Sequence, residues 1–148
     1  MAEQKMTLTG NQLAQLSEQE RRKLSEISRR VNSLQSFRNE LQAARDALEE
    51  VGKNEKGTQI LVNLGGGVFI KASIDDASKA ISSIAANAFT EKSGKELVKE
   101  LDRKIGNLNN SLDAVAGEQQ KVVMRLNQLE QIMEAGMREI RKARDGQK

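Results

Sequence analysis

Apolar residues recur every three or four positions along two long stretches of the chain. In the first stretch these positions are Leu24, Ile27, Val31, Leu34, Phe37, Leu41, Ala44, Leu48 and Val51. In the second they are Leu101, Ile105, Leu108, Leu112, Val115, Gln119, Val122, Leu126, Leu129, Met133, Gly136 and Ile140, with polar or small residues only at Gln119 and Gly136. This spacing is typical of helices with one narrow apolar seam, and it predicts helices over residues 10–52 and 94–145. Two consecutive steps of three residues at Leu34 and Phe37 predict local overwinding of the first helix.

Capping signals indicate where both helices begin and where the first ends. The first helix has two possible starts, because two capping boxes precede its seam: Thr9 with Gln12, and Ser17 with Glu20. Gly52 and Gly57 bracket its end. The second helix has one start signal, Ser93 with Glu96.

The two helices are predicted to pack against each other. Each seam requires a partner helix, and the chain has no proline to break either helix. Antiparallel pairing places residues opposite one another when their numbers sum to about 146. The resulting pairs are Leu13 with Met133, Leu24 with Val122, Val31 with Val115, Leu34 with Leu112, and Leu41 with Ile105. We therefore expect a mainly α fold with a small β region, in which residues 1–148 form a single domain built on a long antiparallel coiled-coil hairpin.

The middle segment, residues 59–92, loses the helical period. Short apolar runs alternate with turn residues and predict four strands at 59–64, 68–74, 79–84 and 88–92, which form two β-hairpins. The first hairpin is apolar on both faces, so we expect these hairpins to join other chains in an oligomer. The predicted oligomerisation residues are Ile60, Val62, Leu64, Val68, Phe69, Ile70, Ile81, Ile84 and Phe89.

Composition argues against an enzyme. The chain has no cysteine and no histidine, which excludes thiolate catalysis, disulfides and the usual zinc sites. Gly65 to Gly67 lack the lysine and hydroxyl pattern of a phosphate-binding loop, and they fit a hairpin turn. Asp75 and Asp76 are adjacent and make a poor metal or acid-base pair. We predict no catalytic residue, no metal site and no cofactor.

Charge and hydropathy limit the partners. Lysine and arginine number 24 against 21 acidic residues, and the two signs interleave throughout. This pattern indicates a solvated surface rather than a nucleic-acid site, although a basic coiled coil on nucleic acid stays as a weaker alternative. No apolar stretch is long enough to span a membrane, and the first residues lack the apolar run of a signal peptide. We therefore expect a soluble cytoplasmic protein with no membrane partner.

The order of helix, two hairpins and returning helix resembles the alpha-class subunit of prefoldin, of the archaeal type. The resemblance spans nearly the whole chain and is strongest in the turn Leu64 to Val68, the strand Phe69 to Ala72 and the exit Glu91 to Ser93. The chain departs from the family at Asn63, where proline is frequent, and at Ala85 to Asn87, where the second turn is usually glycine-rich.

This resemblance implies an ATP-independent holdase that captures unfolded polypeptides and transfers them to a group II chaperonin. It implies a hexamer of two alpha and four beta-class subunits, joined through a β-barrel of hairpins. The sequence leaves open whether the chain assembles alone or only with a beta partner, and which clients it meets. A structural coiled-coil protein acting as an oligomerisation element, filament or spacer without client binding is the main alternative.

Client binding requires exposed and adaptable apolar groups, which methionine supplies. Methionines occur near the start of the first predicted helix and near the end of the second, which antiparallel pairing brings together. We therefore predict a client-binding tip that contains Met6, Leu8, Leu13, Leu16, Met133, Met137 and Ile140. The alternative is that Met133 and Ile140 are ordinary seam residues and that Met1 and Met6 have no role. Polar or small residues interrupt this half of both seams and predict a loosely packed tip: Ser17, Glu20, Gln119 and Gly136.

Overall fold

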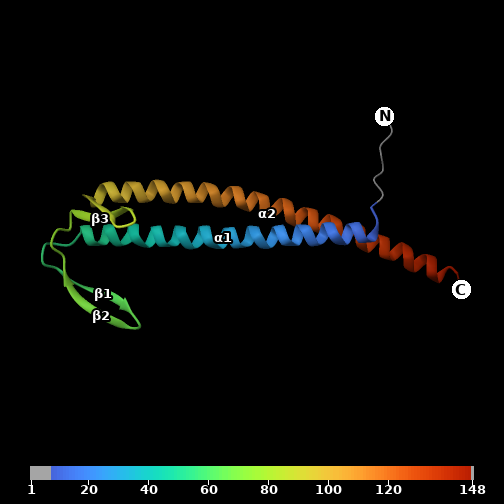
Figure 1. The fold of residues 1–148 in the computed structure, drawn as a ribbon, viewed down its shortest axis with the longest axis horizontal. Coiled ribbons are helices and arrows are strands. Elements are labelled where there is room, and N and C mark those ends of the chain that lie inside the picture. Colours follow the sequence, from blue (N-terminus) through green and yellow to red (C-terminus); the bar gives the residue numbers. More distant parts are fainter. Residues whose placement is uncertain (1–7, 148) are drawn as a thin grey trace, which may run out of the picture. The chain divides into compact units, whose positions relative to one another are not determined.

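The computed structural model describes residues 8–147, and its elements follow the predicted order (Figure 1). They are α1 (Gly10–Gly52), β1 (Gln59–Gly65), β2 (Val68–Ser73), β3 (Lys79–Ala85), β4 (Ala88–Ser93) and α2 (Gly94–Asp145). The mainly α fold with two small β-hairpins is therefore confirmed. The described residues divide into two units: a helix-pair unit (8–34 and 111–147) and a hairpin unit (35–110).

Both helices begin with an N-cap hydrogen bond at a predicted position. At the start of α1 the backbone N–H of Gln12 donates to Thr9 Oγ1 over 3.3 Å, and the N–H of Thr9 donates back to Gln12 Oε1 over 2.9 Å. At the start of α2 the N–H of Glu96 donates to Ser93 Oγ over 3.1 Å. These bonds satisfy N–H groups that have no partner within the helix. The start at Thr9 is thus confirmed over the start at Ser17.

The helix-pair unit has an apolar core in the predicted seam. Val115 and Val122 are each only 3% exposed, and they cluster with Ile27 and Leu126. The half-buried residues that pack on this cluster are Leu24, Val31 and Leu34. The cluster contains both members of the predicted pairs Leu24 with Val122 and Val31 with Val115, as expected if the two seams pack against each other in this unit.

Ion pairs beside the core show that the two helices are antiparallel. Arg30 Nη1 lies 3.3 Å from Glu118 Oε2, and Arg21 Nη2 lies 3.4 Å from Glu130 Oε1. Moving toward the start of α1 therefore moves along α2 toward its end. These side chains are more than half exposed, so each pair adds at most about 1 kcal/mol to stability.

In the hairpin unit the predicted irregularity of α1 is wrong. Phe37 is 49% exposed and Ala44 is exposed, whereas Arg38 and Arg45 are half-buried in the seam. The seam therefore keeps alternating steps of four and three through Leu34, Arg38, Leu41, Arg45 and Leu48. An arginine can occupy such a position because its aliphatic stem covers apolar surface while its guanidinium reaches water.

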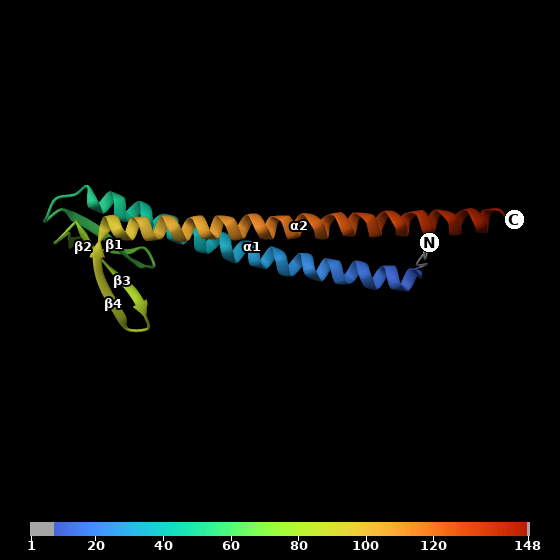
Figure 2. The same ribbon diagram turned by 90° about the horizontal axis from the view of Figure 1, so that it is seen from above.

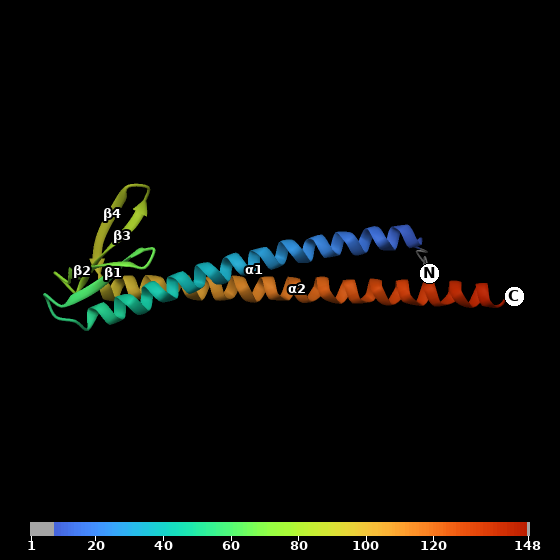
Figure 3. The same ribbon diagram turned by 90° about the horizontal axis from the view of Figure 1, so that it is seen from below.

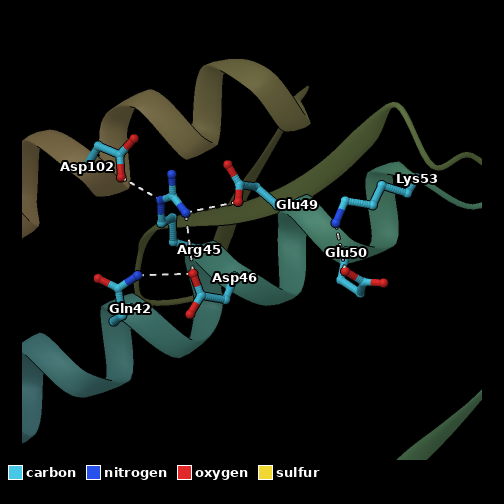
Figure 4. Close-up of polar contacts among 7 residues, drawn as sticks. All are labelled: Gln42, Arg45, Asp46, Glu49, Glu50, Lys53 and Asp102. Atoms are coloured by element: carbon cyan, nitrogen blue, oxygen red, sulfur yellow. Dashed lines mark hydrogen bonds and ion pairs between the residues drawn. The ribbon is translucent and has the colours of Figure 1, made fainter.

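Arg45 joins the two helices of the hairpin unit (Figure 4). Its Nε donates to Asp102 Oδ1 of α2 over 2.6 Å, and its Nη1 donates to Glu49 Oε2 over 2.9 Å. Asp46 Oδ1 accepts a longer bond of 3.3 Å from the same nitrogen. The hydrogen bond to Asp102 is the main reason that the pKa of Arg45 is raised.

The two hairpins have the same architecture. Each is a two-stranded antiparallel sheet, β1 with β2 and β3 with β4, and the two sheets are not hydrogen-bonded to each other. Pairing runs from Gln59 with Ser73 to Gly65 with Val68 in the first, and from Lys79 with Ser93 to Ala85 with Ala88 in the second. Each register shifts just before its turn, between Asn63 and Gly65 and between Ser83 and Ala85. The second hairpin therefore repeats the first with an offset of 20 residues.

The turns reach this shared geometry with different residues. Gly65, Gly66 and Gly67 all have positive φ, as a tight hairpin turn requires. In the second turn Asn87 has φ 62°, and asparagine tolerates this left-handed region better than most residues. The predicted strands are confirmed, with ends that differ from the observed ones by one residue.

Replacing Gly117 with alanine is expected to stabilise the helix-pair unit by about 1 kcal/mol, because glycine is unfavourable inside a helix. A Cβ at Gly117 would meet no atom within 4 Å, so the methyl group adds no clash. Circular dichroism during thermal unfolding measures the change. Gly65→Ala is the control, and its φ of +94° should make it destabilising. A lower unfolding temperature for Gly117→Ala would contradict the expectation.

Candidate functional site

The hairpins carry the largest group of exposed apolar side chains in the hairpin unit. Their exposed fractions run from 47% for Ile70 to 74% for Ile81. Seven of the nine predicted oligomerisation residues belong to this group: Leu64, Val68, Phe69, Ile70, Ile81, Ile84 and Phe89. Ile60 and Val62 are half-buried. Such bulky apolar groups on short sheets with open edges are suited to docking against other chains.

Leu61 is an exposed hairpin residue that is absent from the predicted set. It is 67% exposed, more than Phe69. Its position was readable from the sequence, because alternation along a strand turns Leu61 away from the face of Ile60 and Val62. Leu61 pairs with Lys71 and therefore lies diagonally across from Phe69, within reach of an aromatic ring.

The offset of 20 residues gives the second hairpin the same diagonal pair. Ile81 is equivalent to Leu61, and Phe89 to Phe69. Ile84 likewise repeats Leu64 next to the turn. Each hairpin thus presents one aliphatic and one aromatic side chain on the same face, with a further aliphatic residue at its tip. We call these two surfaces the hairpin faces.

The opposite faces of the two hairpins differ. In the first hairpin the cross-strand pairs Ile60 with Ala72 and Val62 with Ile70 are apolar. The corresponding positions of the second hairpin are Ala80, Lys92, Ser82 and Thr90. Lys92 Nζ donates to Glu100 Oε1 of α2 over 2.6 Å, and this bond lowers the pKa of the Glu100 carboxyl. An ion pair therefore ties the second hairpin to the helix that follows it.

Of the two adjacent aspartates between the hairpins, Asp76 has a structural role. Asp76 Oδ1 accepts hydrogen bonds from the Ser78 hydroxyl over 2.6 Å and from the Ser78 N–H over 2.9 Å. These bonds lower the pKa of Asp76. The Ser78 carbonyl in turn accepts the N–H of Gly94 over 2.8 Å at the start of α2. The turn is thus held by its own polar groups.

In the helix-pair unit α2 continues past the start of α1, as all three ribbon views show (Figures 1, 2 and 3). The predicted tip residues differ in exposure. Leu13 is buried and Met133 half-buried in the seam, whereas Leu8, Leu16, Met137 and Ile140 are exposed. Met1 and Met6 lie outside the described residues. Sequence reasoning left Ile132 out of the tip, although it is 52% exposed.

A polar break separates Leu13 from the apolar core. Ser17 and Glu20 are each 7% exposed and occupy the seam, which confirms that polar residues interrupt it. Lys23 Nζ donates to Glu20 Oε1 over 2.9 Å. Glu20 Oε2 is buried without a hydrogen bond, and the nearest cationic atom paired with it, Arg125 Nε, is 3.7 Å away. Gln119 is half-buried, and Gly136 is exposed.

Neither unit offers a metal centre or a membrane-spanning element within residues 8–147. No group of three or more metal-binding carboxylate, histidine or cysteine side chains occurs in this part of the chain. No helix in it combines the length and the apolar character that crossing a membrane requires.

Comparison with known proteins gives consistent matches. The family model described as Prefoldin subunit matches residues 21–138. The prefoldin subunit alpha of Thermofilum pendens is 30% identical over 105 residues, covering 71% of this chain and 81% of that protein. Prefoldin subunit alpha 1 of Thermococcus kodakarensis is 38% identical over 80 residues, covering 53% of this chain and 54% of its own length. The cryo-EM structure of filamentous PFD from Methanocaldococcus jannaschii superposes with a TM-score of 0.64 at 14% identity, covering 80% of this chain and 96% of that one.

Proposed function

We propose, since the chain belongs to the prefoldin family and is an alpha-class subunit of this chaperone, that it acts as an ATP-independent holdase in the cytoplasm. In this proposal it captures non-native polypeptides with the exposed end of its helix pair and passes them to a group II chaperonin. No catalytic step, metal or cofactor is part of the mechanism. The observation that carries the proposal is the presence of two exposed apolar surfaces. One is the hairpin faces, and the other, which we call the helix end, contains Leu8, Leu16, Met137 and Ile140.

The hairpin faces are the proposed assembly surface. Exposed Leu61, Phe69, Ile81 and Phe89 would be covered by the hairpins of beta-class subunits, in a complex of two alpha and four beta chains. Burying these groups in the complex removes their apolar area from water, which stabilises assembly by about 25 cal/mol for each Å² buried. Pairing of the open strand edges would satisfy backbone groups that a lone two-stranded sheet leaves exposed.

The helix end is the proposed client surface. Met137 and Ile140 are 64% and 59% exposed, and Leu8 and Leu16 lie on the α1 side of the same unit. Non-native chains share exposed apolar side chains rather than a common shape, so a flexible methionine-containing surface suits them better than a fixed pocket.

A filament without client binding is the second candidate. The structural neighbour from Methanocaldococcus jannaschii is described as filamentous. Unpaired hairpin edges would allow an open chain of subunits as readily as a closed ring, because a head-to-tail contact that does not close continues indefinitely. Native mass measurement of the chain alone and with a beta-class subunit separates a discrete hexamer from a ladder of larger species.

Client capture is tested by replacing Met133, Met137 and Ile140 with serine in the assembled complex. We expect the complex to stay intact and its affinity for a chemically denatured client to fall at least about tenfold, because each removed apolar contact is worth about 1 kcal/mol or more. Light scattering during client aggregation gives the measurement. Phe37→Ser, which removes a 49% exposed side chain from the hairpin unit, should retain suppression. Unchanged suppression by the triple variant would refute the assigned surface.

A further inference from the structure

One side of the last turns of α2 combines apolar and basic side chains. Met137, Ile140, Arg141 and Arg144 follow the spacing i, i+3, i+4 and i+7, so they lie on the same side of the helix. All four are exposed. This side continues the seam beyond Met133, the last half-buried seam residue. We call it the arginine face.

The two arginines of this face have no acidic partner within residues 8–147. Arg138 pairs with Glu134 at 3.9 Å, but no ion pair joins Arg141 or Arg144 to another side chain in this part of the chain. Glu139 lies on the other side of the helix, since each residue turns it by about 100°. Asp145 follows Arg141 by four residues and makes no ion pair with it among the described residues.

The helix dipole alone does not account for this arrangement. A cation in the last turn is stabilised whichever side of the helix it occupies. Lys142, on the side away from Ile140, already places a cation in the last turn of α2. What distinguishes Arg141 and Arg144 is their place among exposed apolar groups.

We propose that the arginine face selects non-native segments in which apolar side chains stand next to aspartate or glutamate. Met137 and Ile140 would cover the apolar side chains, while the guanidinium groups of Arg141 and Arg144 would hold the carboxylates. Guanidinium binds carboxylate through two parallel hydrogen bonds, and it stays charged beside apolar surface. This inference rests on the proposed function and names the class of client that the helix end prefers.

The test uses three fluorescein-labelled unstructured peptides with identical apolar residues and with aspartate, glutamine or lysine at the remaining positions. Fluorescence anisotropy measures their binding to the complex of this chain with a beta-class subunit. We expect the aspartate peptide to bind about three to ten times more tightly than the glutamine peptide, and the lysine peptide to bind most weakly. Raising the salt concentration should reduce the difference.

Two double variants with the same change in net charge give the decisive comparison. Arg141→Gln with Arg144→Gln should abolish the preference for the aspartate peptide, whereas Arg138→Gln with Lys142→Gln should retain it. Glutamine preserves helix propensity in both. Equal effects of the two variants, or equal binding of all three peptides by the unaltered complex, overturn the inference alone. If the complex binds no peptide and also fails to suppress aggregation, the proposed function fails with it.

Discussion

Replacing Phe69 and Phe89 together with serine is expected to release this chain from its complexes as a smaller species. These residues hold equivalent positions in the two hairpins and are 54% and 66% exposed in the isolated chain. Burying one phenylalanine contributes about 1.5 to 3 kcal/mol, so losing both weakens assembly by roughly 10² to 10⁴-fold. Native mass spectrometry, or light scattering after size exclusion, measures the change.

The single variants make this experiment more specific. Because the two hairpin faces present the same diagonal pair, Phe69→Ser and Phe89→Ser should weaken assembly by comparable factors. Phe37→Ser removes an exposed aromatic ring from α1 and should leave the mass unchanged. A double variant that assembles like the unaltered chain would show that the hairpin faces are not the assembly surface.

The sequence predicts the elements well because each carries one clear pattern. Steps of three and four specify α1 and α2, and two dense apolar runs around Gly65 to Gly67 specify the first hairpin. The predicted irregularity of the first helix at Phe37 is wrong for a physical reason. Choosing the apolar residue over Arg38 ignores the apolar stem that lets arginine fill a seam position.

Other features of the site are hidden by chemical ambiguity. Ser17 and Glu20 match a capping box and also fall in the seam, and only the bonds between Thr9 and Gln12 settle their role. The repeat of the two hairpins is equally hard to see. At an offset of 20 residues only the phenylalanines 69 and 89 and the serines 73 and 93 are identical, because backbone pairing repeats without requiring the same side chains.

Replacing Glu20 with leucine is expected to stabilise the helix-pair unit by about 1 to 3 kcal/mol. Glu20 is 7% exposed in the seam, and its Oε2 has no hydrogen bond there. Replacing buried charges by apolar side chains of similar size is often stabilising by this amount, and the two cations left behind, Lys23 and Arg125, are more than half exposed. The unfolding temperature and the hydrogen exchange of residues 10–20 provide the measurements, and both should indicate tighter pairing of the two helices.

The exposed neighbour Glu18 supplies the control, because Glu18→Leu changes the same charge outside the seam and should shift stability by less than about 0.5 kcal/mol. Buried polar residues in coiled coils lower stability while fixing register. In the proposed function, Glu20 keeps the start of α1 loosely joined to α2 so that clients can enter. Glu20→Leu should therefore suppress client aggregation less well in spite of its greater stability. A variant that is destabilised, or one that matches Glu18→Leu, would mean that Arg125 and Lys23 already compensate the buried carboxylate in full.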